Sequence, residues 1–207
     1  RYIGVTGVQT CALPISAASA SRGLTPEAYL AFERDAEGKH EYWHGELFAM
    51  AGASRRHNVL VANLVRMLGN ALLDRPCEVY PSDMRVASAS REVFTYPDVV
   101  VVCGEPTFAD DGHDTLLDPL VIVEVLSDST EAYDRGKKFE HYRGIASVQH
   151  YVLVAQDQPL IELYTRQGDG TWTLSDHRMG DVATLSAVRC ELPVAEIYRK
   201  LFEPDAA

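Results

Sequence analysis

The sequence predicts an α/β protein in which a mixed β-sheet is flanked by helices. Residues 99–103 and 120–126 are continuous apolar, β-branched runs, as expected of strands that are buried on both faces. Residues 59–72 carry apolar side chains at spacings of three and four, which is typical of an amphipathic helix of about five turns. Helical and strand patterns then alternate along the chain, which is the element order of an α/β fold.

The first third of the chain contains a helix, a hairpin and the long amphipathic helix. A helix is expected over residues 24–36, because Thr25 can cap its first turn. Residues 39–50 predict an extra N-terminal hairpin with a tight central turn. Ser54 is the expected N-cap of the long helix.

The rest of the chain alternates short strands with two further helices. Residues 132–143 predict a helix that ends at Gly144. An extra C-terminal hairpin is expected around the turn at 168–170. The loop at 104–119, which carries a cluster of aspartates, is expected to be solvated and mobile. The other expected elements are strands at 77–80, 84–87, 149–154, 160–166 and 171–174 and a closing helix at 193–202.

A leader followed by a single domain is the expected organisation. The chain has 207 residues, a length typical of one domain, which we place at residues 22–207. Residues 1–16 share no pattern with the rest and look like a translated sequencing adapter, and residues 17–21 look like a frayed leader. The sequence contains no run of about 18 apolar residues, so we expect no association with a membrane.

The cysteines indicate a reducing environment. Cys11, Cys77, Cys103 and Cys190 are far apart in the sequence and form no CxxC pair. Neither a disulfide framework nor a zinc site is therefore expected. Isolated cysteines in apolar strands are typical core residues, and the cytoplasm is the expected location.

The net charge is strongly acidic. The sequence has 19 lysines and arginines against 30 aspartates and glutamates, a formal charge of −11, which argues against a protein that coats nucleic acid nonspecifically. Basic side chains nevertheless gather in two segments that flank the candidate site described below, so we expect any DNA binding to be weak, local and dependent on a bound cation. These side chains are Arg55, Arg56 and Arg66 in the acid-free segment 51–73, and Arg135, Lys137, Lys138 and Arg143.

Two carboxylates and a lysine form the candidate catalytic set. Asp98 immediately precedes the first buried run, and Glu124 lies inside the second. Burying an unpaired carboxylate costs on the order of several kcal/mol, so a positive partner is expected, either a metal ion or a side chain such as Arg85. Two acids on adjacent strands can bind magnesium, and Lys137 and Lys138 follow on the next helix. This set favours phosphodiester hydrolysis, in which the metal activates water and the lysine stabilises developing charge.

Six segments carry a resemblance to a known family: EYWHGELFAMAGAS, RHNVLVANL, PSDMRV, YPDVVVVCGEP, LVIVEVLSDSTEAYDRGKKFEHYR and VQHYVLV. Over residues 24–201 the chain resembles the bacterial "putative restriction endonuclease" family of the PD-(D/E)xK nuclease superfamily. This resemblance implies a restriction-endonuclease-like core with Mg²⁺ at the carboxylates, and Mn²⁺ as a substitute.

The resemblance also assigns the main motif. The PD of the superfamily motif falls on Pro97 and Asp98, and its second acid falls on Glu124. The third position of the motif is Leu126 instead of lysine, which departs from the superfamily pattern. The resemblance implies that the lysine has moved to the following helix, where Lys138 is the matching position and Lys137 the alternative.

Three further residues complete the expected site. The resemblance implies that Val125 offers its backbone carbonyl to the metal, that Glu46 binds the metal or its water, and that His57 contacts phosphate or water. The predicted protein is a magnesium-dependent endonuclease that hydrolyses DNA, and a homodimer would suit cleavage of both strands. The departure at Leu126 and the acidic charge motivate an alternative, which is a nucleic-acid-binding or assembly module without catalysis.

Overall fold

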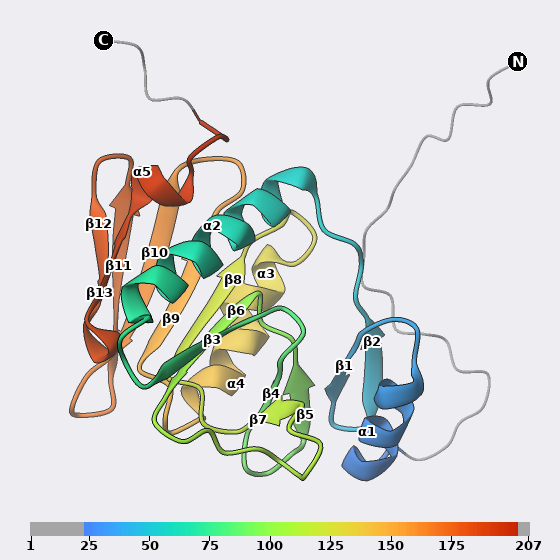
Figure 1. Ribbon diagram of the computed structural model, residues 1–207. Coiled ribbons are helices and arrows are strands. Elements are labelled where there is room, and N and C mark those ends of the chain that lie inside the picture. Colours follow the sequence, from blue (N-terminus) through green and yellow to red (C-terminus); the bar gives the residue numbers. More distant parts are fainter. Residues whose placement is uncertain (1–22, 203–207) are drawn as a thin grey trace, which may run out of the picture.

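The structure, a computed structural model, describes residues 23–202 and is centred on a six-stranded mixed sheet (Figure 1). The strands lie in the spatial order β11-β10-β9-β8-β6-β3, in which β8 and β9 are parallel and the other pairs antiparallel. The predicted mixed α/β fold is confirmed, whereas the expected leader at 1–21 lies outside the described residues. The strand bounds are β3 (Cys77–Pro81), β6 (Val99–Cys103), β8 (Val121–Val125), β9 (His150–Val154), β10 (Leu160–Arg166) and β11 (Trp172–Arg178).

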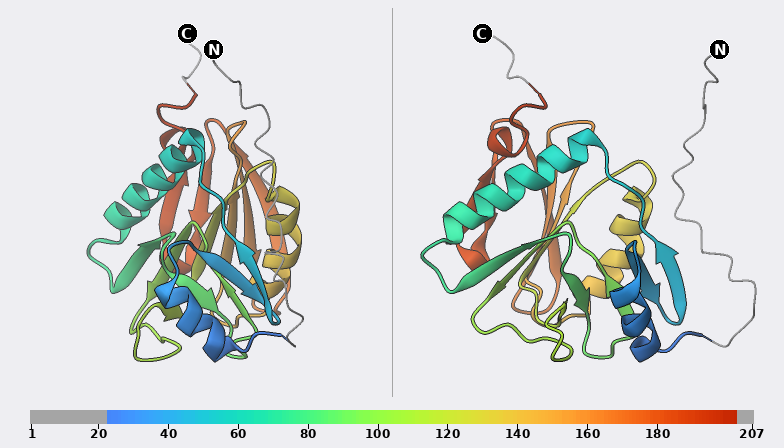
Figure 2. Two further views of the ribbon diagram at one scale, coloured as in Figure 1. Left: turned by 90° about the vertical axis from the view of Figure 1, so that its right-hand side faces the viewer. Right: turned by 45° about the vertical axis from the view of Figure 1, so that its right-hand side comes forward.

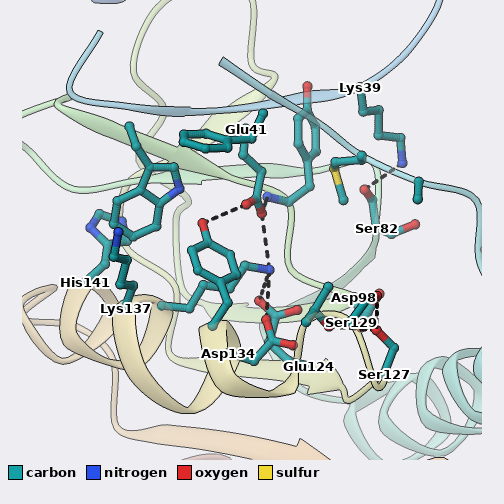
Figure 3. Close-up of a pocket in the computed structure, with 18 of the residues that line it drawn as sticks. Lys39, Glu41, Ser82, Asp98, Glu124, Ser127, Ser129, Asp134, Lys137 and His141 are labelled. Atoms are coloured by element: carbon teal, nitrogen blue, oxygen red, sulfur yellow. Dashed lines mark hydrogen bonds and ion pairs between the residues drawn. The ribbon is translucent and has the colours of Figure 1, made fainter. Parts of the chain in front are cut away.

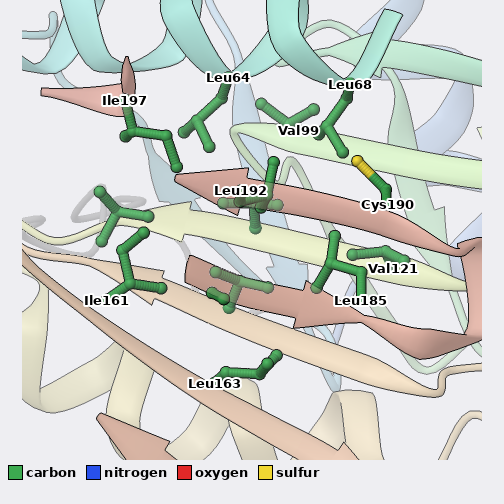
Figure 4. Packing of buried hydrophobic residues seen from close by; sticks show 14 of the residues in the cluster. Leu64, Leu68, Val99, Val121, Ile161, Leu163, Leu185, Cys190, Leu192 and Ile197 are labelled. Atoms are coloured by element: carbon green, nitrogen blue, oxygen red, sulfur yellow. The ribbon is translucent and has the colours of Figure 1, made fainter. Parts of the chain in front are cut away.

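The long helix α2 (Arg55–Leu72) covers one face of this sheet. Ser54 caps it as predicted, because its Oγ accepts a hydrogen bond from the His57 N–H at 3.1 Å. The same face is covered by β12 (Val182–Leu185), η2 (Ser186–Val188), β13 (Cys190–Pro193) and α5 (Val194–Ile197), and Figure 4 shows the resulting apolar core. The helix buries four leucines at helical spacing in that core, namely Leu60, Leu64, Leu68 and Leu72.

A second helical segment covers the opposite face of the sheet (Figure 2). It consists of α3 (Glu131–Tyr133), one π-helical turn η1 (Asp134–Lys138) and α4 (Phe139–Arg143), so the predicted helix at 132–143 is present. Asp134, Lys138 and Tyr142 follow each other at intervals of four residues and are buried against the sheet. The segment therefore carries one acidic and one basic side chain into the protein interior.

A smaller five-stranded sheet lies beside the first, in the order β2-β1-β5-β4-β7. The predicted hairpin is β1 (His40–Trp43) with β2 (Glu46–Ala49), and it pairs with β5 (Val93–Thr95), which was not predicted. The other strands of this sheet are β4 (Arg85–Ala87) and β7 (Thr115–Leu116). The helix α1 (Pro26–Asp35) packs on this sheet and is capped by Thr25, as predicted.

Ion pairs connect the aspartate-rich loop to the rest of the protein, and its composition did not predict these contacts. Arg34 on α1 lies 2.8 Å from Asp110 and 2.8 Å from Asp114. Arg85, which is buried, also pairs with Asp114. The bonds to Arg34 hold the pKa of both aspartates below the ordinary value. Partners that are distant in the sequence therefore contact a segment whose composition indicates only solvation.

The C-terminal region differs from its prediction in two respects. The closing helix is limited to Val194–Ile197, because Pro193 still belongs to β13 and Tyr198 leaves helical geometry. The Tyr198 hydroxyl donates to the Ala155 carbonyl at 2.7 Å, which holds this residue against the sheet. The hairpin of β12 and β13 was not predicted either, although alternating burial along β12 is a strand signal.

The expectation that the cysteines are unpaired is also wrong. Cys77 and Cys103 form a disulfide, because the antiparallel register of β3 and β6 places them opposite each other across a sequence separation of 26 residues. Cys190 is free and buried, as expected of a core residue. The expected location in the cytoplasm rested on unpaired cysteines and loses that support. Among the helices within residues 23–202, none combines the length and the apolar character that a bilayer crossing requires.

Candidate active site

The two predicted carboxylates face each other at the ends of β6 and β8. The antiparallel register of these strands places Asp98 opposite Glu124 on the face that α3 and α4 cover. Asp98 Oδ2 accepts a hydrogen bond from the Val125 N–H at 2.7 Å, and its Oδ1 lies 3.0 Å from His57 Nε2. The structure thus brings four of the predicted site residues together, with His57 positioned by the first turn of α2.

Lys138 enters the same site from the π-helical turn. Its side chain is buried, with an exposed fraction of 7%, whereas the neighbouring Lys137 is exposed. Lys138 Nζ lies 3.0 Å from Glu124, 3.2 Å from Glu41 and 3.4 Å from Asp134. Figure 3 shows these three acids pointing toward one another. The contact with Glu124 is a hydrogen bond, and Glu41 and Asp134 lie within ion-pair distance of the same ammonium group. Of the two candidate lysines, Lys138 is the one that reaches the acids.

Burial and charge act together on the ionisation of this cluster. Burial raises the pKa of Glu124 well above its usual range, and the charges of Asp134 and Asp98 raise it further, against the opposing attraction of Lys138. Burial likewise raises the pKa of Asp134. Burial disfavours the charged form of Lys138, but attraction by Glu124 and Glu41 outweighs it and holds the pKa of Lys138 well above the ordinary value. Lys138 is therefore a buried cation at neutral pH.

The cluster contains more negative than positive charge. Three carboxylates surround one ammonium group, so full ionisation leaves an excess of two negative charges in the interior. Within residues 23–202, Asp134 Oδ1 is buried and has no hydrogen-bond partner, although Lys138 Nζ is 3.4 Å away. Tyr142 donates its hydroxyl proton to Glu124 at 2.9 Å, which stabilises the carboxylate without adding positive charge. Such a cluster favours uptake of a proton or of a further cation.

The structure brings Glu41, and not Glu46, to the lysine. Glu46 is exposed on β2 and, in the described part of the chain, has no ion pair or hydrogen bond to the cluster. Glu41 lies on β1 with an exposed fraction of 6%, and its Oε2 accepts a hydrogen bond from the Tyr133 hydroxyl at 2.9 Å. Sequence reasoning missed Glu41, yet a glutamate inside a short apolar strand is the same signal that identified Glu124.

The partner of Glu124 that was considered as an alternative, Arg85, is engaged elsewhere. Arg85 pairs with Asp114 and donates from Nε to the Thr115 hydroxyl at 3.1 Å. Lys138 therefore provides the positive charge beside Glu124. The site consequently depends on side chains from the central sheet, the π-helical turn and the N-terminal hairpin.

A broad cavity of about 2010 Å³ opens over the cluster. It lies among the β1–β2 hairpin, the start of α2 and the segment that follows β8, and its lining includes all four buried charged residues of the cluster. Ten aspartates or glutamates line it against four lysines or arginines, so the cavity as a whole repels anions. A phosphate ligand would need a cation to offset this field.

Fold and site define a mixed α/β protein with three buried acids and one buried lysine beneath an open cavity. The chain belongs to the Uma2 family, described as "Putative restriction endonuclease", which matches residues 26–195. Two uncharacterized proteins of Synechocystis sp. are related to it: slr1290 is 36% identical over 178 residues, covering 86% of this chain and 93% of the relative. The second, sll1609, is 40% identical over 162 residues, covering 78% and 91%.

A solved structure shares the fold. The crystal structure of a "putative nuclease belonging to DUF820" from Anabaena variabilis superposes with a TM-score of 0.70, covering 84% of this chain and 97% of that one. The two sequences are 15% identical, so this likeness extends the fold assignment and says nothing about individual site residues.

The oxygen atoms at the site suit a magnesium ion. Asp98 and Glu124 present carboxylates from adjacent strands, and Glu124 Oε2 has no hydrogen-bond partner in the described residues. No group of three or more His, Cys, Asp or Glu side chains within residues 23–202 is arranged to hold a metal ion. Magnesium is commonly held by one or two carboxylates with waters and substrate oxygens in its other positions, so two acids suffice.

Proposed function

We propose that the chain is a metal-dependent endonuclease that hydrolyses phosphodiester bonds of DNA. The observation that carries this proposal is the convergence of Asp98, Glu124 and a buried Lys138 beneath one open cavity. Membership of a family described as "Putative restriction endonuclease" supports the same conclusion. We assign the metal to Asp98 and Glu124, with the Val125 carbonyl as a further ligand, and expect Mg²⁺ or Mn²⁺.

The excess negative charge of the cluster supports a divalent cation. Glu41, Glu124 and Asp134 together exceed the charge of Lys138 by two when all are ionised, which is the charge that one magnesium ion carries. The chemistry such an ion supplies is polarisation of a phosphate oxygen and a lower pKa for a coordinated water. A bound cation would also offset the acidic lining of the cavity, which otherwise repels the substrate.

The side chains of this protein have separate roles in the proposal. Lys138, which stays protonated, stabilises negative charge that develops on the phosphate. His57 holds Asp98 in position through the 3.0 Å contact of Nε2 with Oδ1. Glu41 positions Lys138 from the opposite side, since its carboxylate bridges the ammonium group and the Tyr133 hydroxyl. Glu46 contributes nothing to this arrangement beyond its place at the cavity wall.

Unpaired basic side chains support a DNA substrate, and two of them, Arg56 and Lys137, line the cavity. Arg55, Arg56 and Arg66 on α2 have no ion-pair partner within the described part of the chain. Lys137, an exposed residue of the cavity lining, and Arg143 likewise have none among residues 23–202. Arg34, Arg85 and Arg135 are instead paired with acids and are not available to phosphate, as their ion pairs show. We keep a homodimer as the assembly that suits double-strand cleavage.

One observation favours a second candidate, a module that binds nucleic acid without cutting it. Lys138 is hydrogen-bonded to Glu124 and lies within ion-pair distance of Glu41 and Asp134, so the lysine is engaged within the protein. In such a module the ion pairs would stabilise the fold. Magnesium would then not depend on Glu124 for binding.

Nicking of supercoiled plasmid with Mg²⁺ separates the two candidates. The variant Asp98→Asn should lose activity by at least about 100-fold, because it removes a metal ligand. Asp128→Asn is the matched control, since Asp128 is an exposed acid of the same cavity and has no assigned role. Equal nicking by the parent and Asp98→Asn would contradict the assignment.

Calorimetric titration with Mg²⁺ gives an independent readout. Glu124→Gln should abolish magnesium binding, whereas Glu46→Gln, an exposed glutamate on the cavity wall, should leave it unchanged. Binding that survives Glu124→Gln would favour the non-catalytic module.

A further inference from the structure

Three aromatic rings form a wall on one side of the cavity. Trp43 on β1 lies edge-on to Tyr133 of α3, with 5.6 Å between ring centroids, and to His141 of α4, with 5.7 Å. All three residues line the same cavity as the acidic cluster. Tyr133 also connects the wall to that cluster, since its hydroxyl donates to Glu41 at 2.9 Å. The wall is therefore continuous with the candidate active site.

Two polar atoms of this wall lack a partner. Trp43 Nε1 and His141 Nε2 are buried, and neither has a hydrogen-bond partner in the described part of the chain. Because neither nitrogen is accessible, a ligand in the cavity meets the ring surfaces and not these two atoms. Burial lowers the pKa of His141 to about 4, and the nearby His44 adds to this effect, so the imidazole is neutral at pH 7.

The charges around the wall select the kind of ligand. Glu46 is the strand partner of Trp43, Glu92 precedes its other partner, and Glu140 precedes His141, so the wall is bordered by acids. These acids repel phosphate and favour a neutral ligand. A neutral ligand that matches aromatic faces is a planar aromatic ring. Nucleobases have this character, and aromatic side chains bind them by stacking.

We propose that the wall of Trp43, Tyr133 and His141 binds one unstacked nucleobase of the strand whose phosphate lies at Asp98 and Glu124. This inference rests on the proposed function, because it takes nucleic acid as the ligand. The base contacts the aromatic rings that line the cavity. The wall thereby favours substrates with an unpaired nucleotide, such as single strands, flaps or frayed ends.

Tryptophan fluorescence tests this subsite directly. The chain contains two tryptophans, so Trp172→Phe leaves Trp43 as the sole indole. This variant is titrated, with Mg²⁺, with a thymidine decamer and with a decamer of abasic deoxyribose phosphates, and gel analysis checks that both stay intact. We expect the thymidine decamer to quench the emission and the abasic decamer to have little effect. Equal quenching by the two decamers, or none by either, would overturn the proposal.

Affinity measurements complete the test. Trp43→Ala should weaken binding of the thymidine decamer by about tenfold, as expected for the loss of one stacked base. Trp172→Ala is the matched control, because Trp172 stacks with Arg166 on β10, outside the cavity over the cluster. Trp43→Phe, which keeps a ring and removes the N–H, should be intermediate and serves if Trp43→Ala fails to fold. Unchanged affinity in Trp43→Phe and Trp43→Ala would refute the subsite.

The outcomes separate this inference from the proposed function. Quenching without plasmid nicking would leave the base subsite standing and contradict the endonuclease. Nicking without quenching would contradict the base subsite alone.

Discussion

Replacing Lys138 with methionine keeps the length of the side chain and removes its charge. Lys138 is the cation that compensates three buried carboxylates at 3.0 to 3.4 Å, and only 7% of its side chain is exposed. Removing one partner of a buried ion pair costs about 3–5 kcal/mol, and the low exposure means that solvent does not reduce this cost. We therefore expect Lys138→Met to lower the free energy of unfolding by about 3–5 kcal/mol at pH 8 without metal.

The pH dependence of that loss follows from the raised pKa values of Glu124 and Asp134. An acid whose pKa is higher in the folded than in the unfolded state destabilises the fold as pH rises from the unfolded to the folded pKa. The pKa of Lys138 is raised in the folded state, so its charge stabilises the fold fully at any pH below the pKa of a lysine in the unfolded chain. Both pH 5 and pH 8 lie below that pKa. The loss in Lys138→Met should accordingly be smaller at pH 5, where the acids take up protons.

Urea denaturation in EDTA at the two pH values measures both effects. Lys137→Met is the matched control, since Lys137 is the preceding residue and is exposed, and it should change stability by less than about 0.5 kcal/mol. Equal losses in the two variants, or a larger loss at pH 5 than at pH 8, would refute this account of the cluster.

Two further predictions concern other parts of the fold. Burial lowers the pKa of His150 to about 4, and its Nε2 accepts a hydrogen bond from the Ala187 N–H. The neutral imidazole thus stabilises the fold fully above pH of about 6.5, and protonation lowers the free energy of unfolding by up to about 3 kcal/mol at pH 4. In His150→Asn, the free energy of unfolding measured with urea should therefore fall less between pH 6.5 and pH 4. Arg34→Ala should cost no more than about 1 kcal/mol, because the Arg34 side chain is 38% exposed, but should speed amide hydrogen exchange over residues 104–119. Unchanged exchange in that loop would show that Arg34 does not hold it.

Local sequence patterns predicted the elements that bury a continuous or periodic apolar surface. Both buried strands, the long helix with its Ser54 cap and the N-terminal hairpin lie where the patterns place them. The missed elements, such as β5 (Val93–Thr95), are too short to show a period and form because a neighbouring strand pairs with them. The disulfide and the Arg34 contacts escaped prediction for a related reason, since both join residues that only the tertiary fold brings together.

Sequence patterns predicted the site residues whose charged side chains lie in or beside apolar strands. Glu124 stands out as a carboxylate in an apolar strand, and Asp98 stands out because it precedes the neighbouring strand. The choice of Lys138 over Lys137 needed the π-helical turn, which local propensity does not indicate. Glu41 could not be distinguished from Glu46 by spacing, because neighbouring strands of one hairpin offer both to the same side of the molecule.

The residues of the candidate site begin earlier in the sequence than the motif residues indicate, because the N-terminal hairpin contributes Glu41. A fragment starting at Ala53 would retain Asp98, Glu124, Lys138 and His57, and hence every residue that a motif search requires. It would lack Glu41, so Lys138 would lose one of its three carboxylates and Tyr133 its acceptor. Under the proposed function the hairpin is therefore part of the active unit, and a fragment without it should be inactive even though every motif residue is present.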